Sequence, residues 1–229
     1  MHIALEEAKA EYTLYTIDVM NKPAWYITDV NPATKVSSSR RNILLAQLPT
    51  LQIPAITYGG PAVAPDQPSP EAFKLAESVV IIEFLADLFP ESGLLPADPI
   101  GHAKARFFIT AFDATVFEGF KGFFFMGAPA ATLIDGIDAL QKLLPATGFA
   151  AGEKWSIADI AVAPFLARIV MLLKNDLGRY PVGEGKKTLE VLHGEKFARI
   201  NKYFGDLKAQ PSFKATWDEV RPPVCECMC

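Results

Sequence analysis

Two short segments of this 229-residue sequence carry residues suited to holding the amino-acid end of a peptide. Ile53-Pro54-Ala55 places a proline at the start of a predicted strand, where a cis peptide bond would turn the preceding backbone toward a ligand. Glu77 and Ser78 stand where a strand gives way to a helix. Ser78 is predicted to cap that helix, whose free N–H groups bind anions. A carboxylate would then be held by Ser78 and the backbone, and an ammonium group by Glu77; an ordinary helix cap is the alternative.

Other chemistry is poorly supported by the sequence. It has no G-x-S-x-G, H-E-x-x-H, phosphate-binding loop or G-x-G-x-x-G motif. The three histidines lack a ligand or catalytic partner at a recognisable spacing, and we expect no metal. All the cysteines lie in the last five residues, where a C-x-C-x-C pattern suits a soft metal or a frayed terminus. The run Phe123-Phe124-Phe125 fits either a ligand wall or plain helical core.

Composition limits the class of protein. Half of the residues are apolar, 21% are charged, and the formal net charge is −4. These values exclude a disordered chain, and there is no basic excess for binding nucleic acid. The most apolar stretch, residues 157–173, is interrupted by Asp159, Pro164 and Arg168, so we predict no membrane span. No secretory leader or disulfide framework is recognisable, which predicts a cytoplasmic protein.

The elements that must position these residues form a small α/β unit followed by an all-helical unit. In the first unit, periodicity and residue type predict helices at residues 3–10 and 22–30, and strands at residues 12–19 and 54–58. Residues 71–89 fit either one helix or a short strand with a helix starting after Ser78. The predicted domains are residues 1–89 and 100–220, with a proline-rich linker at 90–99 and a tail at 221–229.

The second unit is predicted to be helical throughout. Ser156 and Asp159 have the spacing of a capping box at the start of the most apolar helix. Because that helix is apolar nearly all round, we expect it to be central and buried. The predicted helices are residues 100–126, 129–144, 156–173, 189–208 and 212–220.

Ordered segments along nearly the whole chain resemble the cytosolic glutathione transferases, most closely the fungal omega-type members. Each segment is loose by itself, but their order and spacing are specific. They are NKPAW at residues 21–25, NPATK at 31–35, IPAITYGG at 53–60, LAESVVIIEFLADLFP at 75–90, LLPADP at 94–99 and SIADIAVAPFL at 156–166.

The resemblance implies a two-domain fold, a thioredoxin-like N-terminal domain followed by a helical one, with glutathione bound between them. It implies that Lys22 contacts the glycine carboxylate of glutathione and that the Ile53 backbone, before a cis Pro54, contacts the cysteinyl backbone. Glu77 and Ser78 would hold the γ-glutamyl end. It also implies thiol transfer or conjugation of glutathione to small hydrophobic electrophiles, and a homodimer. Hydrophobic or aromatic substrates would lie on the first helix of the second domain, against Phe107, Phe108, Phe112 and Phe117.

The sequence departs from the family pattern in two places. Family members begin with a strand and a loop that carries the catalytic residue, but here the resemblance starts at the following helix, so no catalytic residue is assigned. Residues 36–52 separate two segments that the family joins directly. A retained intron is one explanation; a surface loop or an extra strand around Ile43 is the other. A non-catalytic binder of aromatic small molecules is the alternative function.

Overall fold

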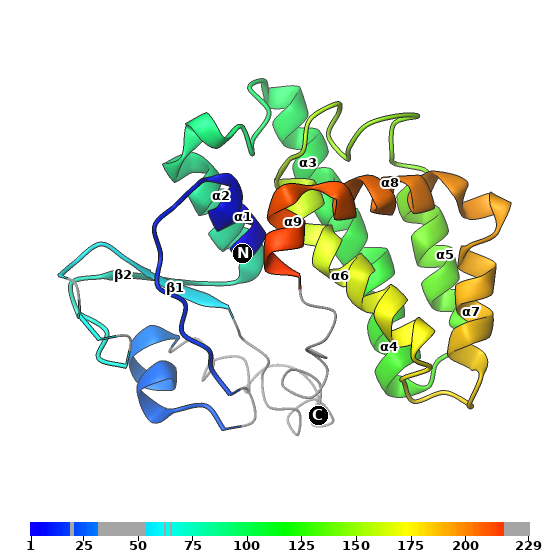
Figure 1. The fold of residues 1–229 in the computed structure, drawn as a ribbon, viewed down its shortest axis with the longest axis horizontal. Helices are drawn as coiled ribbons and strands as arrows, with labels where there is room; N and C mark the ends of the chain where they lie inside the picture. Colours follow the sequence, from blue (N-terminus) through cyan, green and yellow to red (C-terminus); the bar gives the residue numbers. More distant parts are fainter. Residues whose placement is uncertain (19–20, 32–53, 62, 65, 218–229) are drawn as a thin grey trace.

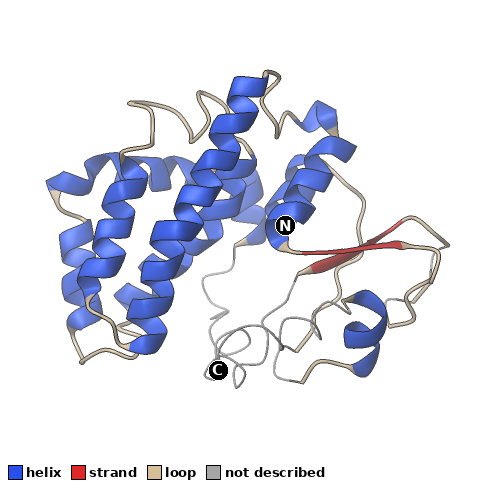
Figure 2. Ribbon diagram, turned by 180° about the vertical axis from the view of Figure 1, so that it is seen from behind, coloured by secondary structure: helices blue, strands red, loops and turns tan. Residues whose placement is uncertain are grey.

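The computed structural model describes residues 1–18, 21–31, 54–61, 63–64 and 66–217. Figures 1 and 2 show a smaller part, built around a two-stranded sheet, beside a larger bundle of helices. This arrangement confirms the predicted fold class, a small α/β unit followed by an all-helical unit. The segment at residues 36–52, Ile53 and the cysteine tail lie outside the described residues.

The smaller part contains two helices that were predicted from the sequence. Helix α1 (His2–Glu7) and the short π-helical turn η1 (Tyr26–Val30) correspond to the predicted helices at residues 3–10 and 22–30. Strand β1 (Ala55–Tyr58) pairs antiparallel with β2 (Phe73–Ala76), and helix α2 (Ser78–Leu88) follows directly. The second interpretation of residues 71–89, a short strand followed by a helix, is therefore confirmed.

The predicted strand at residues 12–19 is wrong over its described part. Residues 11–18 have no regular structure, and the side chains of Tyr12, Leu14 and Tyr15 are exposed. Alternating β-branched and aromatic residues favour a strand only where a neighbouring backbone accepts the pairing. In the part of the chain that the structure describes, β1 and β2 pair only with each other.

The larger part begins with a turn and a long, slightly irregular helix. The 3-10 turn η4 (Pro90–Ser92) leads to α3 (Pro99–Phe112), whose first turn is capped by the Asp98 carboxylate. A π-helical turn, η5 (Asp113–Phe117), then continues into α4 (Glu118–Met126). The predicted helix at residues 100–126 is therefore confirmed as one unbroken run with a π-helical turn within it.

The remaining helices complete the bundle. They are α5 (Ala130–Gln141), α6 (Ile157–Lys174), α7 (Glu184–Leu192), α8 (Ala198–Ala209) and α9 (Pro211–Thr216), with a 3-10 turn η6 (Glu195–Phe197) before α8. The prediction of one helix over residues 189–208 is wrong, because the chain leaves the helix at His193 and Gly194. Gly194 is extended, and the Asn201 side chain donates a 2.8 Å hydrogen bond to the Leu192 carbonyl at the end of α7. Glycine is a poor helix former, which favours a break here.

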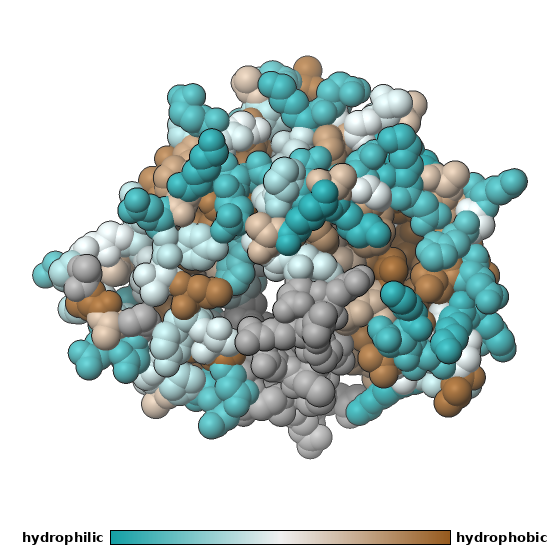
Figure 3. All heavy atoms as spheres, viewed as in Figure 1, coloured by the Kyte–Doolittle hydropathy of each residue, from teal (hydrophilic) through white to brown (hydrophobic). Residues whose placement is uncertain are grey.

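Helix α6 lies at the centre of the bundle and packs against α2, α3, α7 and α8 (Figure 1). Most of its side chains are buried, as predicted. Its capping box is also confirmed: the Ser156 N–H donates to the Asp159 carboxylate at 2.8 Å, and Asp159 is fully buried. On the face drawn in Figure 3, apolar residues reach the surface among hydrophilic ones over both parts. Among the described residues, none of the helices has the length and hydropathy of a membrane span.

Candidate functional site

The two-stranded sheet brings the predicted ligand-binding segments together. Ala55 at the start of β1 lies opposite Ala76 at the end of β2. Because the strands are antiparallel, Pro54, just before β1, and Glu77, just after β2, lie at the same end of the sheet. Ser78 then begins α2 at this end. Residues 54 and 77–78, far apart in sequence, therefore lie at one end of the sheet and make up one candidate site.

Glu77 has a backbone conformation that is rare for a residue with a side chain. Its φ is +75° and its ψ is 115°. Such a conformation costs about 1–3 kcal/mol and persists only where the surrounding structure holds the residue in it. Glu77, not Ser78, is the N-cap residue, because its carbonyl accepts the first helical hydrogen bond, from the Ile81 N–H at 2.9 Å. The prediction that Ser78 caps α2 is therefore wrong. Ser78 is instead the first residue of the helix.

The start of α2 has the properties of an anion site. The Glu77 side chain makes no capping hydrogen bond to the helix. The N–H groups in the first turn of a helix have no acceptor within the helix, and the helix dipole adds partial positive charge there. The Ser78 hydroxyl lies in this same turn. A ligand with a carboxylate and a neighbouring ammonium group would meet N–H donors, a hydroxyl and the Glu77 carboxylate together.

The other two predicted contacts are less well defined. Lys22 is half-buried just before η1, and η1 packs against β1. Burial lowers the pKa of the Lys22 ammonium group from its ordinary value. Ile53 lies outside the described residues, so its role and the predicted cis bond before Pro54 stay predictions.

The four predicted phenylalanines do not form one wall. Phe112 and Phe117 both contact Phe165 of α6, with ring centroids 5.5 Å and 5.3 Å apart. Phe107 and Phe108 instead line a cavity together with residues of the segment that connects α5 to α6. Phe108 and Phe112 are each 2% exposed and serve the core, whereas Phe117 is half-buried.

Sequence reasoning missed three residues around Phe117. Phe165 is half-buried, and the Arg168 guanidinium carbon lies 5.7 Å from its ring centroid. Lys121 lies 5.0 Å from the Phe117 ring centroid and 2.7 Å from the Glu118 carboxylate. The pair Phe117 and Phe165 therefore carries a cation beside each ring. The available signal was Arg168, the one charged residue between Asp159 and Lys174 of a mostly apolar helix, one turn from Phe165.

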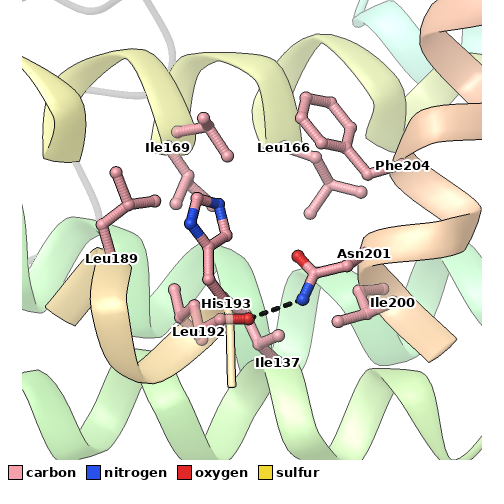
Figure 4. Close-up of a pocket in the computed structure, with 10 residues that line it drawn as sticks. Ile137, Leu166, Ile169, Leu189, Leu192, His193, Ile200, Asn201 and Phe204 are labelled. Carbon is pink, nitrogen blue, oxygen red and sulfur yellow. Dashed lines mark hydrogen bonds between the residues drawn. The ribbon is translucent and has the colours of Figure 1, made fainter. Parts of the chain in front are cut away.

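A second cavity, between α5, α6, α7 and α8, lacks the features of a catalytic site. It measures about 40 Å³ and is lined mostly by leucine and isoleucine side chains. Figure 4 shows the His193 ring among these side chains, with Asn201 bonded to the Leu192 carbonyl. In the part of the chain that the structure describes, no group of three His, Cys, Asp or Glu residues is placed to hold a metal ion.

Comparison with known proteins decides the family. The model of the glutathione S-transferase C-terminal domain matches residues 130–206. Over 98% of its length the chain is 48% identical to glutathione transferase Omega 1C from Trametes versicolor, covering 87% of that chain with a TM-score of 0.87. The chain belongs to the glutathione transferase family. It is an enzyme of glutathione-dependent transfer, and this favours the enzymatic prediction over the non-catalytic binder.

Two further relatives match most of the chain, and the first of them supports the omega-like character of this glutathione transferase. Glutathione transferase Omega 2S from Trametes versicolor, solved in complex with 2,4-dihydroxybenzophenone, is 44% identical over 96% of this chain and 88% of that chain, with a TM-score of 0.84. The pyrimidodiazepine synthase of Drosophila melanogaster is 24% identical over 97% of this chain and 82% of its own. The resemblance seen in the sequence is therefore confirmed.

Proposed function

We propose that the site at the start of α2 holds the γ-glutamyl end of glutathione. The observation that carries this proposal is the strained backbone of Glu77 beside Pro54. Strain of this kind clusters at functional sites, where it fixes groups for a ligand. The γ-glutamyl α-carboxylate would accept hydrogen bonds from the Ser78 hydroxyl and from the first N–H groups of α2. The γ-glutamyl ammonium group would form an ion pair with the Glu77 carboxylate, while Lys22 and Ile53 would contact the remainder of the peptide.

We further propose that the co-substrate lies against Phe117 and Phe165. Both rings are half-buried, and α6, which carries Phe165, packs against α2, which begins at the proposed glutathione site. Flat aromatic surfaces flanked by Lys121 and Arg168 suit a hydrophobic electrophile with an electron-rich or anionic group. The dihydroxybenzophenone in the Omega 2S complex is an aromatic compound with an electron-rich, hydroxylated ring.

The proposed reaction needs the glutathione thiolate. A free thiol titrates near pH 8.5, so about a few per cent is ionised at pH 7. In conjugation the sulfur attacks an electrophilic carbon, forming a thioether while the leaving group departs with its electron pair. In thiol transfer the sulfur attacks a disulfide, forming a mixed disulfide and releasing the other thiolate. In both reactions the thiol proton passes to solvent.

Isothermal titration with glutathione tests the site. Ser78→Ala and Glu77→Gln each remove a hydrogen bond to a charged group, so we expect the dissociation constant to rise about tenfold or more. Glu83→Gln is the matched control, because Glu83 lies on the same helix and pairs with Arg106 at 2.8 Å. Equal affinities in all four proteins would contradict the proposal.

We also propose that the protein is cytoplasmic, acts in detoxification as a homodimer and does not bind nucleic acid. Its two domains would be divided by a linker at residues 90–99.

Support for the dimer comes from Tyr58 and Phe73, which face each other across β1 and β2 and are 47% and 52% exposed. Both rings contact Phe84 of α2, forming an aromatic surface that a second copy would cover. Light scattering tests this: Phe73→Ser should shift the mass from dimer to monomer, and a monomeric wild type would contradict it.

A further inference from the structure

A cavity of about 280 Å³ lies between α3 and the segment that joins α5 to α6. Helix α3 contributes Lys104, Phe107 and Phe108 to its walls, and the connecting segment contributes Pro145 and Ala151 among others. An apolar cavity of about 150 Å³ is enough to bind benzene. This one therefore has room for a compound of one or two rings.

Two of the large apolar side chains that line the cavity are exposed to solvent. Phe107 is 62% exposed and Leu143 is 39% exposed, although both line the cavity. The inner wall of the cavity is part of the packed core, because Phe108 is 2% exposed and packs edge-on against the buried Tyr203, with ring centroids 6.2 Å apart. An aromatic ligand in this cavity would cover exposed apolar surface without requiring the core to move.

Among the described residues that line the cavity, Lys104 is the one cation. Lys104 lies one turn before Phe107 and Phe108 on α3, so the three side chains share a face of the helix. Lys104 forms no salt bridge with any of the described residues. The nearby Asp98 carboxylate accepts a hydrogen bond from the Gly101 N–H at 2.9 Å, which lowers its pKa, and the charge of Lys104 contributes to this lowering without forming a salt bridge. The ammonium group is thus placed to pair with an anion that enters the cavity.

We propose that this cavity is a second ligand site, which binds small planar aromatic carboxylates. The rings lie between Phe108 and Ala151, and the carboxylate meets Lys104. The site is separate from the Phe117–Phe165 surface, because Phe107 precedes Phe117 by ten residues, or about 15 Å along a helix. One small ligand does not span both, and the proposal does not depend on glutathione binding.

Calorimetric titration with 2-naphthoate tests this site, using 2-naphthylmethanol as the neutral counterpart and saturating glutathione throughout. Lys104→Gln should weaken naphthoate binding about tenfold and leave naphthylmethanol binding unchanged, because only the anion loses its charge partner. Ala151→Leu fills the cavity and should weaken both compounds. Lys214→Gln, the same charge change on α9, should weaken neither.

Three results would overturn the proposal. One is the absence of saturable naphthoate binding at millimolar concentration. Another is unchanged naphthoate affinity in both Lys104→Gln and Ala151→Leu, with thermal melts showing that the variants are folded. The last is loss of naphthoate binding in Phe117→Ala with retention in Ala151→Leu, which would place the ligand on the Phe117–Phe165 surface instead.

Discussion

The hydroxyl of Tyr203 donates a 2.7 Å hydrogen bond to the carboxylate of Asp159, and both side chains are fully buried. The same carboxylate oxygen accepts the Ala150 N–H at 2.9 Å, while the other accepts the N–H and the hydroxyl of Ser156, each at 2.8 Å. One carboxylate thus connects α8, the start of α6 and the turn before it. Since α6 is the central helix of the bundle, this contact should matter to the whole fold.

Removing the Tyr203 hydroxyl should measure that connection. Tyr203→Phe keeps the ring and its packing but deprives a buried carboxylate of one donor, so we expect a loss of about 1–2 kcal/mol in the free energy of unfolding. Denaturant titration measures this value. Tyr12→Phe is the control, because the Tyr12 hydroxyl bonds to Glu6 on the surface. A loss no larger than the control's would show that the buried bond contributes nothing.

Asp159 should also make stability depend on pH. Burial raises its pKa above the ordinary 3.8, although the hydrogen bonds from Ala150, Tyr203 and Ser156 oppose this. The folded state then holds the proton more tightly than the unfolded state. The contribution of this group to stability is fully present below pH 3.8 and is lost as pH rises through the raised pKa.

The comparison of wild type with Asp159→Asn isolates this titration from those of the other carboxylates. Unfolding free energies measured at several pH values above 3.8 should show the wild type losing stability relative to the variant as pH rises. The reverse slope, with the wild type gaining relative stability, would mean that the hydrogen bonds outweigh burial and that the pKa is lowered.

Much of the fold could be predicted from local patterns. The capping box at Ser156 and Asp159 and the apolar run of α6 both depend on neighbouring residues, and both were found. The strand at residues 73–76 was one of the two interpretations that residues 71–89 allowed. The strand predicted at residues 12–19 is wrong over its described part, because pairing depends on a distant backbone that no local pattern describes. The break at Gly194 was missed because the apolar periodicity continues across it.

The candidate site was likewise only partly predictable from the sequence. Pro54, Glu77 and Ser78 could be named from residue type and element boundaries, and the sheet register places them together. The cap itself was assigned one residue too late, because the positive φ of Glu77 leaves no trace in the sequence. Phe165 and Arg168 were missed because Phe165 reaches Phe117 only through the packing of α6 against η5, and Arg168 lies beside the Phe165 ring.

The strain at Glu77 predicts opposite effects on stability and binding. Glycine adopts positive φ without a steric cost, so Glu77→Gly should raise the free energy of unfolding by up to about 1 kcal/mol. It should also weaken glutathione binding, because the carboxylate is gone. Glu77→Ala, which loses the carboxylate but keeps the strain, is the matched control for affinity. A glycine variant that is less stable than the alanine variant would contradict this account.

The Phe117–Phe165 surface predicts selectivity among electrophiles. Phe117→Ala removes a half-buried ring, so kcat/KM for an aromatic electrophile should fall about tenfold, with most of the change in KM. An aliphatic electrophile of similar reactivity provides the control and should lose much less. Steady-state assays at saturating glutathione measure both. Equal losses for the two electrophiles would indicate a general structural effect.

The central claim is that this chain binds glutathione at the start of α2. Thermal unfolding of the full chain with and without glutathione tests it most directly, because a ligand that binds only the folded state stabilises it. At 100 times the dissociation constant the gain should be about 2.7 kcal/mol, and the midpoint should rise with glutathione concentration. In the double variant Glu77→Gln/Ser78→Ala, the same glutathione concentrations should raise the unfolding midpoint much less. A wild-type midpoint that does not move at any glutathione concentration would contradict the account.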